Sequence, residues 1–156
     1  MKAADQFFDK IGLHVDLQHF VMDSRSMVFC NYFVAKPGFW RAWLEINEKL
    51  YALSEPSGDL YESLNALTDY HGSKIPIKVF IMERIVSLLF AMDASWSARA
   101  YDPFAMSISA HFAQHLHASI LCDALKIAFR TQGHEEYMTK YLELLNQYSI
   151  PQPQKQ

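Results

Sequence analysis

Residues 76–92 are apolar on almost every side of a helix, and this segment restricts the fold more than any other. A helix of this kind is stable in water only when other elements cover it on several sides. Lys78, Glu83 and Arg84 interrupt the segment, which argues against a membrane span. We therefore expect a central helix at 76–92, packed inside a helical domain.

Five other segments carry helical signals of their own. Their apolar residues recur every three or four positions, most clearly after Pro37, which suits the first position of a helix because it lacks an N–H. Gly12 and Gly133 are placed to end two of these helices. We expect a short helix at 3–10 and longer ones at 37–53, 59–70, 107–129 and 135–148.

Residues 27–34 differ from the rest of the chain because they are β-branched and aromatic, with apolar residues on both faces. This pattern is typical of a buried strand, although a run this short also fits a helix. Asn31 is its one strongly polar member. The predicted fold class is therefore mainly α, a single domain of about five helices with one or two short β segments.

Length and composition indicate one globular unit with more apolar residues than its core can bury. The 156 residues fit a single domain at 1–150, followed by a disordered tail at 151–156. The net charge of -3 gives no electrostatic reason to bind nucleic acid. Apolar residues make up 51% of the chain, more than one small core absorbs, so we expect a homodimer that covers the excess.

The cysteines and the first residues indicate the compartment. Cys30 and Cys122 each lie in an apolar stretch with no second thiol nearby, which favours buried free thiols over a disulfide or a zinc site. The first residues lack the continuous apolar core of a signal peptide. We therefore expect the protein in the cytoplasm.

Glu83 and Arg84 stand in the middle of the most apolar helix, where an ionised side chain is costly unless it is paired. Adjacent residues of a helix do not face each other, so each side chain needs its own partner elsewhere. One interpretation is the polar floor of a binding site. The other is a structural ion pair, or a pair of side chains that reach solvent at the edge of the helix.

Three histidines, His111, His115 and His117, form the other polar cluster. The first two share a helix face, but the zinc-protease pattern needs a Glu directly after the first His, and this chain has Phe112 there. Two histidines also leave a zinc site short of a third ligand. We therefore expect no bound metal, and the role of these histidines stays open.

Other enzyme signatures are missing from the sequence. It holds no Gly-rich phosphate loop, no nucleophile elbow and no Asp-x-Asp pair for a divalent cation, so we expect no cofactor. Trp40 and Trp43 could stack on a sugar ring, and their helical spacing also suits a core. Catalytic residues are therefore not assigned.

The stretch from Phe29 to Trp40, Phe-Cys-Asn-Tyr-Phe-Val-Ala-Lys-Pro-Gly-Phe-Trp, precedes an amphipathic helix and then Val-Phe-Ile-Met-Glu-Arg-Ile at 79–85. Together these segments resemble the C-terminal part of bacterial nucleotide-sugar glycosyltransferases of capsule and exopolysaccharide synthesis. The resemblance spans residues 27–90. It implies that Asn31 and Tyr32 lie at the rim of a sugar-binding cleft, with Glu83 and Arg84 in or behind it.

The same resemblance implies what the chain lacks. Such enzymes bind the nucleotide on an N-terminal α/β half with a metal-holding acidic motif, and neither precedes residue 27 here. The chain is then a glycosyltransferase-related domain or fragment, inactive alone, with a nucleotide sugar or a glycan as its ligand. The alternative is a non-catalytic helical module for binding or oligomerisation.

Overall fold

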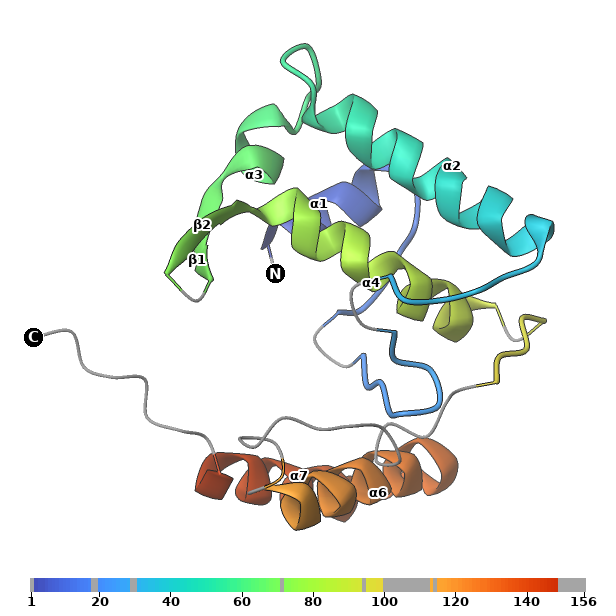
Figure 1. Cartoon of the computed structure of the whole chain (residues 1–156), viewed down its shortest axis with the longest axis vertical. Coiled ribbons are helices and arrows are strands. Elements are labelled where there is room, and N and C mark those ends of the chain that lie inside the picture. Colours follow the sequence, from blue (N-terminus) through green and yellow to red (C-terminus); the bar gives the residue numbers. More distant parts are fainter. Residues whose placement is uncertain are drawn as a thin grey trace, which may run out of the picture. The chain divides into compact units, whose positions relative to one another are not determined.

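The computed structural model describes residues 2–17, 20–28, 31–70, 72–93, 95–99, 113 and 115–148 (Figure 1). These residues form six helices and one two-stranded sheet, so the mainly α fold class is confirmed. The chain divides into two compact units, residues 1–20 with 26–98 (unit 1) and residues 21–25 with 99–156 (unit 2). The single domain at 1–150 stays a prediction, and the tail at 151–156 lies outside the described residues.

Unit 1 contains four helices: α1 (Lys2–Lys10), α2 (Pro37–Ser54), α3 (Tyr61–Asn65) and α4 (Ile77–Met92). Three of them match the helices predicted at 3–10, 37–53 and 76–92. Pro37 occupies the first turn of α2, as expected, and Lys36 before it is extended because a residue that precedes proline disfavours helical geometry. Gly12 follows α1 with a φ of 77°, a conformation that glycine adopts without strain.

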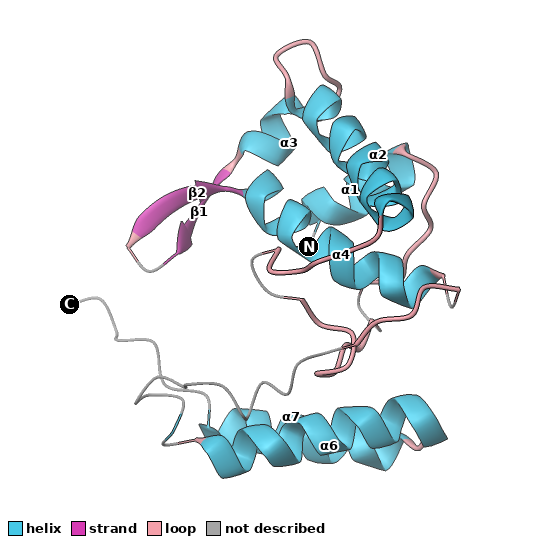
Figure 2. Ribbon diagram, turned by 45° about the vertical axis from the view of Figure 1, so that its right-hand side comes forward, coloured by secondary structure: helices cyan, strands magenta, loops and turns pink. Residues whose placement is uncertain are grey.

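The core of unit 1 gathers around α4, which lies beside α1, α2 and α3 (Figure 2). Residues 85–89 of α4 are all buried, so the helix is covered on several sides in its second half, as its sequence predicts. The other elements contribute mainly Phe and Leu side chains to this core. Its buried members are Phe7, Phe8, Phe39, Ile46, Leu50, Leu64, Ile81, Ile85, Val86, Leu88 and Leu89.

The helix predicted at 59–70 is wrong beyond residue 65. It stops at α3, and a hairpin follows, with β1 (Leu67–Tyr70) antiparallel to β2 (Ser73–Pro76). The side chains of Asp69 and Lys74 form an ion pair of 2.9 Å across the strands, and Gly72 adopts a φ of 82° in the turn. These cross-strand and turn contacts outweigh the weak helical period of the segment.

The strand predicted at 27–34 is absent from the described part of that segment, which excludes residues 29 and 30. The Val28 N–H donates to Ser87 Oγ of α4 at 2.8 Å, where a strand would pair with a neighbouring strand. Asn31 then turns the chain with a φ of 56°, which no strand accommodates. Val28 and Phe33 pack against the core of unit 1, whereas Tyr32 and Val34 are exposed, so burial accounts for only part of the apolar character of this segment.

Unit 2 contains α6 (Leu116–Gln132) and α7 (Glu135–Tyr148), which lie side by side (Figure 1). The α7 bounds match the helix predicted at 135–148. Gly133 ends α6 with a φ of 76°, and its N–H donates to the Phe129 carbonyl, as its position in the sequence indicates. The first residues of the helix predicted at 107–129 lie outside the described residues, and α6 begins at Leu116.

Candidate functional site

The four residues predicted to form a sugar site all belong to unit 1. Asn31 and Tyr32 lie in the segment that precedes α2, and Glu83 and Arg84 lie in the middle of α4. More than fifty residues of sequence separate the two pairs, so any shared site depends on how this segment packs against α4.

The hydrogen bond between the Val28 N–H and Ser87 Oγ attaches this segment to α4. Ser87 is completely buried, and its hydroxyl would be costly to bury without such a partner. Glu83 lies one helical turn before Ser87, and Asn31 lies three residues after Val28. This contact therefore places Val28, three residues before Asn31, on the same helix that carries Glu83 and Arg84.

Asn31 combines two unfavourable features. Its φ of 56° is rare for any residue with a Cβ atom, and its buried side-chain Oδ1 accepts no hydrogen bond from the residues that the structure describes. A buried acceptor without a donor costs about 1–3 kcal/mol. Strain of this kind persists where the surroundings impose it, and it is more frequent at functional positions than elsewhere.

Aromatic side chains surround the entry to α2. Tyr32 is 86% exposed, and the ring of its neighbour Phe33 stacks on Trp40 with 4.4 Å between ring centroids. Trp40 in turn packs edge-on against Trp43 at 5.5 Å and keeps 40% of its surface exposed. Trp43 packs into the core, as one interpretation of the sequence holds, while Trp40 offers an accessible ring face.

Glu83 and Arg84 occupy different environments. Glu83 is half-buried and Arg84 is exposed, so Arg84 fits the alternative of a side chain that reaches solvent at the edge of the helix. The two residues are adjacent and point in different directions from α4, because successive helical residues are about 100° apart. Arg84 therefore reaches solvent, where a guanidinium can meet a ligand.

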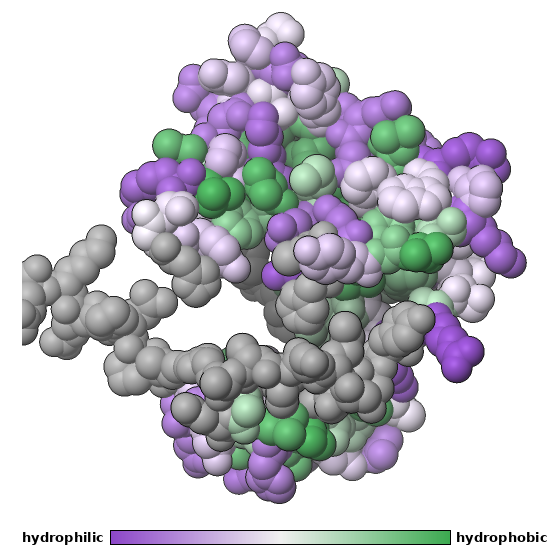
Figure 3. Space-filling model, in the orientation of Figure 1, coloured by the Kyte–Doolittle hydropathy of each residue, from purple (hydrophilic) through white to green (hydrophobic). Residues whose placement is uncertain are grey.

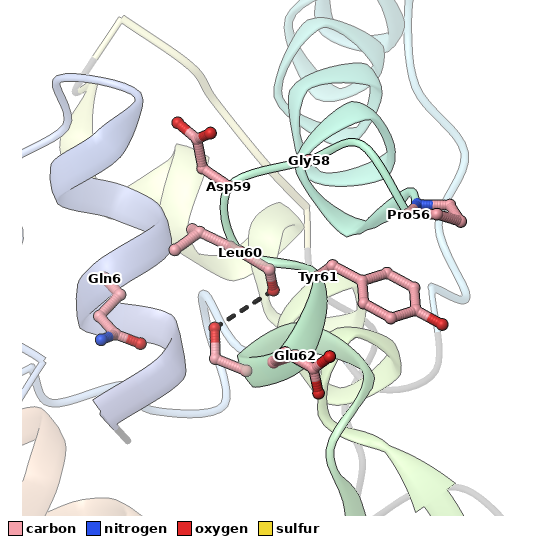
Figure 4. A pocket seen from close by; sticks show the side chains of 8 residues that line it. Gln6, Pro56, Gly58, Asp59, Leu60, Tyr61 and Glu62 are labelled. Carbon is pink, nitrogen blue, oxygen red and sulfur yellow. Dashed lines mark hydrogen bonds between the residues drawn. The ribbon is translucent and has the colours of Figure 1, made fainter.

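A separate open depression of about 440 Å³ lies between α1 and the start of α3 (Figure 4). Asp59 forms an ion pair with Lys10, and that hydrogen bond and charge lower the pKa of the Asp59 carboxyl. The depression holds none of the four predicted site residues, and no sequence motif marks it. Its lining is mostly polar: Gln6, Pro56, Gly58, Asp59, Leu60, Tyr61, Glu62 and Ser63.

In unit 2, a polar cluster that sequence analysis missed holds the segment 21–25 on α6. Asp23 is completely buried and accepts hydrogen bonds from Arg25 at 2.7 Å and from Arg130 at 2.9 Å. The backbone N–H and the hydroxyl of Ser24 both donate to Asp123. Burial raises the pKa of Asp23, but the hydrogen bonds from Arg25 and the charges of Arg130 and Arg25 outweigh it and lower the pKa.

These contacts join residues about one hundred positions apart, so no local motif could have indicated them. The cluster is saturated with hydrogen bonds, which suits a structural role better than a binding site.

The described histidines and cysteine give no metal site. No group of three or more His, Cys, Asp or Glu side chains surrounds a common point within the described residues. The His115 ring packs against Tyr148 at 5.8 Å, and Cys122 is half-buried with a pKa raised by its burial. His111 and Cys30 lie outside the described residues, so the expectation of no metal stays a prediction.

Among the helices that the structure describes, none combines the length and the hydropathy needed to cross a membrane. Comparisons of the chain with protein-family models, with curated proteins and with solved structures gave no match.

Proposed function

We propose that the chain is a glycosyltransferase-related domain that binds a sugar or a nucleotide sugar in unit 1 and does not transfer the sugar by itself. The binding residues are Asn31, Tyr32, Glu83 and Arg84. We also propose that it acts in the bacterial cytoplasm, in the synthesis of capsule or exopolysaccharide, and binds no nucleic acid.

The observation that supports this proposal best is the hydrogen bond from the Val28 N–H to Ser87 Oγ. It joins Val28, three residues before the Asn-Tyr-Phe motif, to the helix that carries the Glu-Arg motif, and these are the two motifs of the family resemblance. Val28 and Ser87 are 59 positions apart in the sequence, so the apolar period of either segment could not have predicted this contact.

The residue types suit a sugar ligand. An exposed aromatic ring such as that of Tyr32 packs against the apolar face of a pyranose and offers a hydroxyl to its rim. The Asn31 amide N–H groups can donate hydrogen bonds to sugar oxygens, and the Glu83 carboxylate can accept them from sugar hydroxyls. The Arg84 guanidinium can bind the phosphates of a nucleotide sugar in a bidentate manner.

Transfer itself requires more than binding. The departing diphosphate develops negative charge that a bound metal or clustered donors must stabilise. The sequence offers no Asp-x-Asp pair, no Gly-rich loop and no basic cluster for this purpose. We therefore propose that the chain contributes recognition of the sugar.

The test is thermal unfolding of the full chain with a panel of nucleotide sugars and free sugars, with and without manganese. A ligand that binds only the folded state raises the melting temperature. At a concentration of one hundred times its Kd, it adds about 2.7 kcal/mol to the free energy of unfolding. We expect Tyr32→Ala to weaken binding about tenfold, the loss of one aromatic contact. Tyr61→Ala is the matched control, because Tyr61 is an exposed tyrosine of the separate depression near α3.

Loss of binding in Tyr61→Ala with none in Tyr32→Ala would place the ligand in that depression and contradict the proposed site. If no sugar of the panel raised the melting temperature, sugar binding itself would be contradicted.

The second candidate function is homodimeric assembly, and a specific observation favours it. Large apolar side chains of the described residues are exposed on several helices, most of them on α2, α6 and α7, and Figure 3 shows hydrophobic surface (green) on the face that it draws. Burying such surface against a second copy is favourable, and two-fold pairing is the commonest arrangement among oligomers. The exposed residues are Trp40, Leu44 and Tyr51 on α2, and Ile120, Leu121, Leu142, Leu145 and Tyr148 on α6 and α7.

A further inference from the structure

One exposed stripe on α2 carries both apolar and charged residues in a self-complementary order. Trp40, Leu44 and Tyr51 are 40%, 49% and 65% exposed. They are spaced by four and seven residues, so they line one side of the helix over three turns. Phe39, Ile46 and Leu50, about 120° further round the helix, are buried in the core of unit 1.

Arg41 and Glu48 lie along one flank of this stripe, seven residues or two turns apart. Both are exposed, and neither forms an ion pair within the described part of the chain. The other two charges nearby, Glu45 and Lys49, pair with each other on α2 at 2.9 Å. Arg41 and Glu48 are therefore opposite charges, at matched positions, that the chain itself leaves available.

We infer that α2 pairs with α2 of a second copy of this chain, antiparallel and about a two-fold axis near the middle of the helix. Such an axis reverses the residue order, so Trp40 of one protomer faces Tyr51 of the other and the two Leu44 side chains lie close to the axis. The same flank of each stripe meets its counterpart. Arg41 of each protomer then faces Glu48 of the other, which gives two symmetric ion pairs.

Charge complementarity is what selects a second copy as the partner. A parallel two-fold pair would turn the flank that carries Arg41 and Glu48 away from its counterpart, so these charges would form no ion pairs with each other. The antiparallel pair instead buries an apolar stripe between two ion pairs. The inference rests on the assembly function proposed above and uses none of the four sugar-site residues.

Charge reversal tests this geometry because the two positions compensate each other. In Arg41→Glu both ion pairs of the dimer become contacts between two carboxylates, and in Glu48→Arg both become contacts between two guanidiniums. We expect each variant to dimerise about tenfold more weakly, since each reversal changes two contacts at once. The R41E/E48R chain restores both pairs, and so does an equimolar mixture of the two single variants, which forms a heterodimer.

The measurement is sedimentation equilibrium of the full chain at several concentrations, with circular dichroism to show that each variant is folded. The wild-type chain is expected at twice its mass of 18.0 kDa. The E45K/K49E chain is the matched control, because it reverses two charges of α2 that already pair with each other and so leaves the dimer unchanged. A folded Leu44→Asp chain is expected as a monomer.

A wild-type chain that stays at 18.0 kDa at high concentration would overturn both the interface and the assembly function. A dimer that withstands Leu44→Asp or both single reversals would overturn this interface alone. An R41E/E48R chain no tighter than the single variants would exclude the antiparallel register. Sugar binding is measured separately, so its outcome does not decide any of these.

Discussion

At the scale of single residues, Asn31 is the position where conformation and proposed function meet. Its backbone has a φ of 56°, and its buried Oδ1 accepts no hydrogen bond from the described residues. Glycine tolerates this conformation, whereas a β-branched side chain does not.

We predict that Asn31→Val lowers the free energy of unfolding by about 1–2 kcal/mol, whereas Asn31→Gly leaves it within about 1 kcal/mol of wild type. Urea denaturation followed by circular dichroism measures both values. Both variants are expected to weaken sugar binding, because both remove the amide. Equal losses of stability in the two variants would show that the backbone at Asn31 is not strained.

Asp23 differs from Asn31, because both of its carboxylate oxygens accept hydrogen bonds. Its pKa is lowered in the folded state, so the unfolded chain binds the proton more readily. The stability that Asp23 contributes is therefore present at neutral pH and is lost as the pH falls below the ordinary aspartate range near 3.8.

We predict that Asp23→Asn lowers stability at pH 7 and reduces the acid dependence of unfolding below about pH 4. Thermal melts between pH 2 and pH 7, roughly the range over which carboxyl groups titrate, give both quantities. If the melting temperature of the variant depended on pH in the same way as that of wild type, the arginine partners would not lower the pKa of Asp23 in the folded state.

At the scale of elements, the sequence predicted the long helices well because their signals are local. The apolar period of α2 and α7 and the nearly continuous apolar surface of α4 follow from side chains a few residues apart. The errors have two causes. Residues 27–34 contact α4 through Ser87, 59 positions from Val28, whereas the hairpin at 67–76 forms between nearby residues whose strand pairing competes with a weak helical period.

The end of α6 is a local signal whose energy can be measured. Gly133 has a φ of 76° and open space where a Cβ would stand, so a substitution there acts through the backbone alone. We predict that Gly133→Ala destabilises the chain by about 1 kcal/mol, whereas Gln132→Ala, one residue earlier within α6, costs less than about 0.5 kcal/mol. Chemical denaturation of the two variants gives the comparison, and equal values would contradict the cap.

At the scale of the whole molecule, the candidate site was predicted in part. The four residues Asn31, Tyr32, Glu83 and Arg84 came from a family resemblance, and periodicity gave only their places on a segment and a helix. The strain at Asn31 was not predictable because it depends on tertiary packing, whereas the exposure of Arg84 was among the alternatives that the sequence left open. The charge pattern of α2 was present in the sequence, but only the exposed fractions show that apolar side chains lie beside these charges on the surface of the helix.

The central claim is that unit 1 binds a sugar-containing ligand through residues of two separate segments. Titration calorimetry of the best nucleotide sugar from the thermal screen tests it most directly, with wild type, Tyr32→Ala, Arg84→Ala and the Tyr61→Ala control. Arg84 is exposed, so its variant is expected to stay folded.

We predict a single site for which Tyr32→Ala and Arg84→Ala each raise the Kd about tenfold or more, while Tyr61→Ala leaves it unchanged. Arg84→Ala should weaken binding of the nucleotide sugar more than binding of the free sugar, because its guanidinium is assigned to the phosphates. Equal affinities in all four proteins, or heat from none of them, would contradict the account.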